Sequence, residues 1–95
     1  MSAVLCSGCV EPYEEYVLRG TFSAGNEDYF LWREIDTELR AHGIEAGNLK
    51  SGVRDGVWGY QAFFYTLHDC QRAIPILLNL TFIESAFNCS RITYV

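Results

Sequence analysis

The sequence has few basic residues, few prolines and no long apolar run. Seven lysines and arginines stand against twelve acidic residues, which gives a formal net charge of −5 over 95 residues. A chain this acidic is a poor candidate for direct binding to nucleic-acid phosphates. Two prolines and eight glycines are too few for a collagen-like or low-complexity chain. These scarcities leave a small globular domain as the expected class.

Signals for a membrane or for export are also missing. The longest apolar stretch, 73–83, is interrupted by Pro75, Asn79 and Thr81 and is too short to cross a bilayer. The segment 1–16 has no basic region ahead of an apolar core, so it does not read as a secretory signal. We therefore expect a cytoplasmic protein whose four cysteines are free thiols or metal ligands rather than disulfides.

What the sequence does have is an uneven distribution of charge. Residues 1–45 hold nine acidic residues and three arginines, whereas residues 46–95 hold three acidic and four basic residues. An acidic half of this kind attracts a basic partner.

Periodicity predicts one α+β domain over residues 13–95, preceded by an irregular lead-in over 1–12. Residues 13–22 alternate as a strand, and 27–42 have the apolar spacing of a helix, with Asn26 as N-cap and Gly43 as C-cap. Residues 47–67 predict a hairpin that turns at Asp55-Gly56.

The remaining third of the chain allows two interpretations. A helix over 70–87, capped by Asp69, is favoured over a short helix to Ile74 followed by a strand, although Pro75 opposes a long helix. Residues 91–95 alternate as a final strand. The resulting order predicts a ferredoxin-like βαββαβ sandwich, in which a four-stranded antiparallel sheet carries both helices on one face.

Cysteine and histidine suggest a possible zinc site. Cys6 and Cys9 form a C-x-x-C pair before the first strand, and His68 and Cys70 follow the third strand. Antiparallel pairing of these strands would bring the four side chains to one pole of the sheet, where they could bind zinc tetrahedrally. Cys89, at the start of the last strand, is expected at the opposite pole.

The third predicted strand is rich in aromatic residues. Its run Trp58-Gly59-Tyr60-Gln61-Ala62-Phe63 partly resembles the third-strand motif of RNA-recognition domains, without the leading basic residue of that motif. The resemblance implies that Trp58 and Tyr60 stack bases on the open sheet face. The negative charge favours a different role for these aromatic side chains, as a protein-binding or homodimer surface.

The leading hypothesis is therefore a non-enzymatic interaction or regulatory protein with no cofactor. Its partner-binding residues are expected on an acidic helix face and on the aromatic strand: Glu27, Glu34, Glu38, Glu45, Trp58 and Tyr60. In one specific form it inhibits its partner by covering a basic nucleic-acid-binding surface. The alternatives are a zinc-stabilised module that uses Cys6, Cys9, His68 and Cys70, and a small-ligand-binding or enzymatic dimer with a site near His68. No nucleophile, phosphate-loop or metalloprotease motif supports catalysis.

Overall fold

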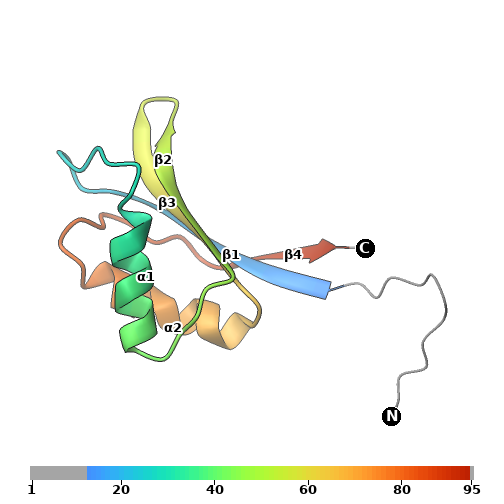
Figure 1. Cartoon of the computed structure of the whole chain (residues 1–95). Helices are drawn as coiled ribbons and strands as arrows, with labels where there is room; N and C mark the ends of the chain where they lie inside the picture. The colour runs from blue at the N-terminus through green and yellow to red at the C-terminus, as the bar shows by residue number, and fades with distance from the viewer. Residues whose placement is uncertain (1–12, 95) are drawn as a thin grey trace, which may run out of the picture.

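A four-stranded antiparallel sheet and two α-helices make up the part of the chain that the computed structural model describes, residues 13–94 (Figure 1). The strands lie in the order β2-β3-β1-β4. The elements are β1 (Tyr13–Thr21), α1 (Trp32–Ala41), β2 (Asn48–Arg54), β3 (Val57–Phe64), α2 (Leu67–Leu78) and β4 (Ser90–Tyr94). The predicted α+β class is confirmed.

The first strand lies inside the sheet, between β3 and β4. Leu18 of β1 is opposite Ala62 of β3, and both side chains point toward the helices. Strands β2 and β3 form the predicted hairpin, and its two turn residues, Asp55 and Gly56, have φ angles of 52° and 79°. Positive φ at both positions is the geometry that makes Asp-Gly a preferred hairpin turn.

The core lies between the sheet and the helices, which Figure 1 shows on the same side of the sheet. Alternate residues of β1 and β3, such as Leu18 and Phe64, meet Ile35 and Leu39 of α1 and Leu77 of α2, and all five are fully buried. Each such side chain contributes about 1.5–3 kcal/mol through its removal from water. The other sheet face is not covered by either helix.

Helix α1 begins later than predicted. The expected start at Glu27, with Asn26 as N-cap, is wrong: the helix begins at Trp32, and Asn26 closes a turn on the carbonyl of Ser23. The carbonyl of Tyr29 bonds outside the helix, because it accepts a hydrogen bond from the Ser51 hydroxyl at 2.6 Å, whereas the carbonyl of Leu31 accepts the Ile35 N–H. Residues 27–31 therefore form an anchored loop whose last residues turn into the helix.

The end of α1 is as predicted from Gly43. This glycine has a φ of +76°, and its N–H donates to the carbonyl of Arg40, while the Ile44 N–H donates to the carbonyl of Leu39. The two bonds form a Schellman motif, which requires the left-handed conformation that glycine adopts at little cost. Ile44 is buried immediately after the cap, so the chain turns back into the core there.

Helix α2 agrees with neither of the two interpretations of this segment. It begins before Asp69, because Thr66 is the N-cap and its hydroxyl accepts the Asp69 N–H. Pro75 lies within its last turn, where the missing N–H leaves the carbonyl four residues earlier without its helical donor. The helix ends at Leu78, and residues 79–89 contain neither a helix nor a strand.

A disulfide joins Cys70 of α2 to Cys89, just before β4, with the Cα atoms 6.2 Å apart. This corrects two predictions: Cys89 does not lie at the opposite pole from Cys70, and these two cysteines are not free. The segment before Cys89 runs beside β1, where the Phe87 N–H donates to the carbonyl of Arg19. That path carries Cys89 back over α2. Within residues 13–94, no helix is both long and apolar enough to cross a membrane.

Candidate interaction surfaces

The aromatic residues of β3 do not lie where base stacking would need them. Tyr60 faces the helices, is only 4% exposed and donates its hydroxyl to the carbonyl of Ser85 at 2.8 Å. Burial raises the pKa of Tyr60 well above its usual range. Trp58 lies on the same face and is half-buried. The expectation that both side chains stack bases on the open sheet face is therefore wrong, and Tyr60 is not accessible to any partner.

The exposed aromatic surface instead comes from the loop before α1. Tyr29 and Phe30 are 57% and 58% exposed, and the Tyr29 ring packs edge-on against Trp58 with the centroids 4.8 Å apart. Ser51 of β2 fixes this loop, since its hydroxyl donates to the Tyr29 carbonyl and accepts the Trp32 N–H at 3.1 Å. The loop is thus attached to the hairpin by its backbone, and its aromatic rings remain in solvent.

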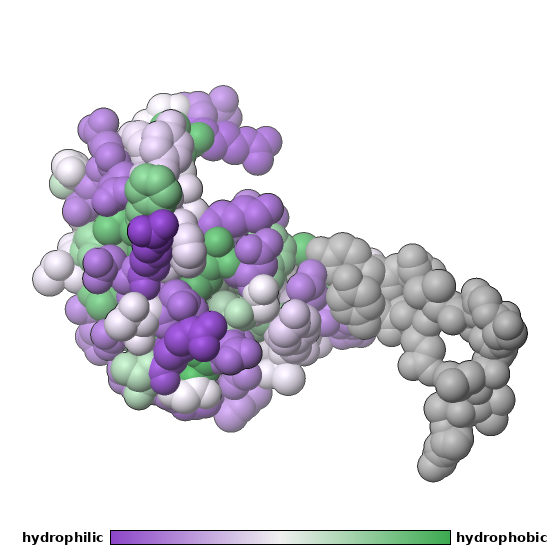
Figure 2. Space-filling view, viewed as in Figure 1, coloured by the Kyte–Doolittle hydropathy of each residue, from purple (hydrophilic) through white to green (hydrophobic). Residues whose placement is uncertain are grey.

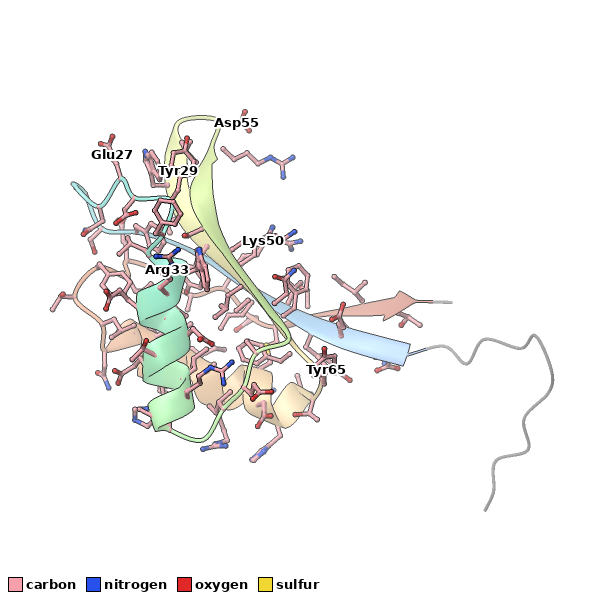
Figure 3. All side chains as sticks on the ribbon, viewed as in Figure 1. Glu27, Tyr29, Arg33, Lys50, Asp55 and Tyr65 are labelled. Carbon is pink, nitrogen blue, oxygen red and sulfur yellow. A yellow bond between two sulfur atoms is a disulfide. The ribbon has the colours of Figure 1, made fainter. Side chains whose placement is uncertain are left out.

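Arg33 extends this surface along the first turn of α1. Its guanidinium lies 4.9 Å from the centroid of the Phe30 ring and 5.5 Å from that of Trp32. Such stacking holds a long side chain in place without an ion pair. Figure 3 shows Tyr29, Arg33 and Glu27 on the same side of the hairpin. We call Glu27, Tyr29, Phe30, Arg33, Glu34 and Trp58 the aromatic-loop surface.

A groove of about 410 Å³ adjoins this surface between the turn at 23–27 and the tip of the hairpin. Trp58 and Val57 supply apolar wall, and the carboxylates of Glu27 and Glu84 are its charged groups. No lysine or arginine of the described residues lines it. The groove suits a positively charged side chain that enters beside an apolar contact.

The four predicted carboxylates do not form a single free acidic face. Glu45 lies 3.4 Å from Arg40, so the far end of α1 carries an ion pair, and Glu38 lies there 3.8 Å from the His42 ring. Glu27 and Glu34 form no ion pair with any residue of the described segment, and both border the exposed aromatic residues. The available negative charge is therefore at the start of α1.

Sequence reasoning missed Tyr29, Phe30 and Arg33 as surface residues. It assigned the start of this run to the first turns of a helix, where Tyr29 and Phe30 lie outside the apolar stripe of Leu31, Ile35 and Leu39. The signal that could have revealed this surface is the presence of two large aromatic residues outside the apolar stripe of the helix.

No protein family, curated protein or solved structure matches this chain. Its function therefore has to follow from the geometry and charge of its own surfaces.

The predicted zinc ligands are only partly placed by the structure. Cys6 and Cys9 lie outside the described residues. Cys70 is bonded to Cys89, so its sulfur is not a free thiolate, and His68 is exposed on the first turn of α2. Within residues 13–94 no three metal-ligating side chains come together. A four-ligand site that includes Cys70 would require its disulfide to be reduced.

A second groove, of about 520 Å³, lies on the sheet face opposite the helices. Arg19, Lys50 and Arg54 line it together with one carboxylate, that of Asp55, and with apolar Val57 and Phe87. His68, the centre of the predicted small-ligand site, lines neither groove. The two grooves thus differ in charge, one with carboxylates and one mainly with cations, and they meet at the tip of the hairpin.

Proposed function

We propose that this protein is a non-enzymatic binding module that recognises a partner protein through the aromatic-loop surface. The observation that carries the proposal is a pair of exposed aromatic rings, Tyr29 and Phe30, on a backbone that Ser51 already fixes. Side chains that are ordered before binding lose less conformational entropy in a complex. Tyrosine, tryptophan and arginine are also the residues that most often dominate the binding energy of protein interfaces.

The charge around these rings defines the chemistry of the partner. Glu27 and Glu34 have no cationic partner within residues 13–94, and the adjacent groove adds Glu84. A partner that places lysine or arginine beside an apolar patch would neutralise these carboxylates. Basic surfaces of this kind serve nucleic-acid binding in many proteins, so the proposed form of regulation is competition with nucleic acid for the partner.

The test compares two matched phenylalanines. Phe30 and Phe87 are 58% and 59% exposed but lie on different surfaces, so Phe30→Ala and Phe87→Ala remove equal apolar area. A photo-crosslinking residue at Thr37, which is exposed one helical turn after Arg33, first captures the partner from the native host, and the purified partner is then titrated with each variant. Phe30→Ala should weaken binding about tenfold or more, and Phe87→Ala should change it less than about twofold.

Charge is tested at two glutamates of the same helix region. Glu34→Lys should weaken binding and reduce its salt dependence, whereas Glu45→Lys, at the end with paired charges, should have a smaller effect. Equal affinities of the Phe30 and Phe87 variants would contradict the proposed surface. A partner that binds nucleic acid equally well with and without this protein would contradict the competitive form.

The finer topology is also part of this proposal. We propose that the domain is ferredoxin-like, because a helix connects β1 to β2 and another connects β3 to β4, and β3 pairs with both β1 and β2. Homodimerisation through the sheet stays a prediction, and sedimentation of the purified protein over a range of concentrations would test it.

A further inference from the structure

The open face of the sheet carries a cluster of cations that the proposed protein-binding surface does not use. Leu18 and Ala62 point toward the helices, so their neighbours Arg19 and Gln61 point to the opposite face. Lys50 of β2 is opposite Gln61 of β3, and Arg19 of β1 is opposite Gln61 on its other side. The three residues therefore form one row across three strands. Figure 3 shows Lys50 on the side of the hairpin away from α1.

This row places two cations within reach of one ligand. Neighbouring strands are about 4.8 Å apart, so the Cα atoms of Lys50 and Arg19 lie about 10 Å apart on the same face. Arg54 lies on the same face of β2, further toward the hairpin tip. None of the three forms an ion pair with another residue of the segment 13–94. The three cations line one concave surface, where Asp55 beside Arg54 supplies the single carboxylate.

Two glycines, one in β2 and one in β3, form part of the sheet surface between these cations. Gly52 of β2 is opposite Gly59 of β3, and Thr21 of β1 is opposite Gly59 on its other side. Both glycines have local packing reasons, since a Cβ on Gly59 would collide with the Gly20 carbonyl and one on Gly52 would press on Tyr29. Both glycines line the groove, which the space-filling view shows as a hollow below the hairpin tip (Figure 2).

The walls of the groove are apolar on two sides. Val57 stands near the hairpin tip, and Phe87 stands at the opposite wall with 59% of its surface exposed. Lys50 extends over the Phe63 ring, with its Nζ 5.9 Å from the ring centroid. Cations beside an aromatic ring and an uncovered backbone floor offer contacts for both an anionic group and a flat apolar group.

We infer that this groove binds a compact organic phosphate, with the phosphate on Lys50 and Arg19 and its planar or apolar part against Phe87. The volume of about 520 Å³ lies within the range of small-molecule sites. A long polyanion is disfavoured, because the groove with Glu27 and Glu84 begins at the same hairpin tip. Beyond about 8–10 Å, salt screens these carboxylates from a small ligand at physiological ionic strength.

The test is a titration of the full chain with ADP in the absence of metal, followed by backbone amide chemical shifts. Saturable shifts are expected in residues 19–21, 50–54 and 59–61 and not in α1. Lys50→Gln should raise Kd about tenfold. The matched control is Arg91→Gln, which removes the same charge from an exposed residue opposite Tyr16, on the helix side of the sheet, and should change Kd less than about twofold. Phe87→Ala should weaken binding of ADP more than that of inorganic pyrophosphate.

Three results would overturn the inference. The first is the absence of saturable shifts at about 10 mM salt, where electrostatic attraction is screened least. The second is an equal loss of affinity in Lys50→Gln and Arg91→Gln, which would indicate a general charge effect. The third is binding of a single-stranded oligonucleotide, or of a second copy of the chain, without binding of ADP. Arg54→Gln provides an independent variant, because its side chain is exposed and unpaired within the described segment.

Discussion

Loss of the Cys70–Cys89 disulfide is expected to lower the free energy of unfolding by about 3 kcal/mol. The bond closes a loop between residues 19 positions apart, and the chain-entropy relation for a loop of this length gives that value at 25 °C. The loop contains the second half of α2 and all of the irregular segment 79–89. Without the bond, this segment gains freedom mainly in the unfolded chain.

Cys89→Ala is the variant of choice. Cys70 is fully buried in the core, so its truncation would add a cavity to the loss of the bond, whereas Cys89 is only half-buried. Urea unfolding of the wild type with and without reductant, and of the variant, separates the two effects. With a denaturant dependence of about 1–3 kcal/mol per molar urea, the wild-type midpoint should fall by about 1–3 M on reduction. The midpoint of the variant should not respond to reductant.

Peptide mapping of the disulfide accompanies the unfolding experiment. In an unreduced tryptic digest, peptides 55–72 and 73–91 should appear as a linked pair and separate on reduction. An unchanged wild-type midpoint in reductant, with the linked pair present, would refute the loop-entropy reasoning. Separate peptides in the unreduced digest would refute the bond itself.

Two further predictions concern single positions in the core and at a helix end. Burial raises the pKa of Tyr60, so its contribution to stability is complete below about pH 10 and is lost above it, by up to about 1.4 kcal/mol per pH unit. Tyr60→Phe should lower the free energy of unfolding by about 1 kcal/mol at neutral pH, because it removes the hydrogen bond to Ser85. Urea unfolding from pH 8 upward should show that the free energy of unfolding of this variant falls less steeply with pH than that of the wild type; equal slopes would contradict this. Gly43→Ala should lower the free energy of unfolding by about 1–2 kcal/mol, because φ at this position is +76°, and Gly43→Asn should lower it less. Equal melting temperatures of the wild type and both variants in thermal unfolding would contradict the role of Gly43 as the helix cap.

The features that the sequence predicts well are those decided by a few adjacent residues. Asp55-Gly56 determines the hairpin turn, and Gly43 determines the end of α1, because each needs only a local backbone conformation. The start of α1 could not be found in this way. It depends on Ser51, a residue of the following strand, which takes the carbonyl of Tyr29 out of any helical turn.

The candidate surfaces depend still more on contacts between distant residues. Aromatic residues occupy both faces of β3, so alternation alone does not tell which face Tyr60 takes; the pairing of Gly20 with Tyr60 decides it. Lys50 and Arg19 share a row only through the register of two separate strand pairs. The Cys70–Cys89 bond depends on the path of an irregular segment, which has no periodicity to read.

The place of β1 inside the sheet has a consequence for the order of folding. The β2–β3 hairpin and the two helices involve residues close in sequence, so they can form early at a low entropic cost of loop closure. Strand β1 pairs with β3 across the whole first helix and hairpin, and its pairs with β4, such as Tyr13 with Tyr94, span nearly the whole described chain, so β1 must wait for contacts between distant residues. Strand β1, which precedes the other described strands in the sequence, should thus be among the last to gain protection of its amides from hydrogen exchange during refolding.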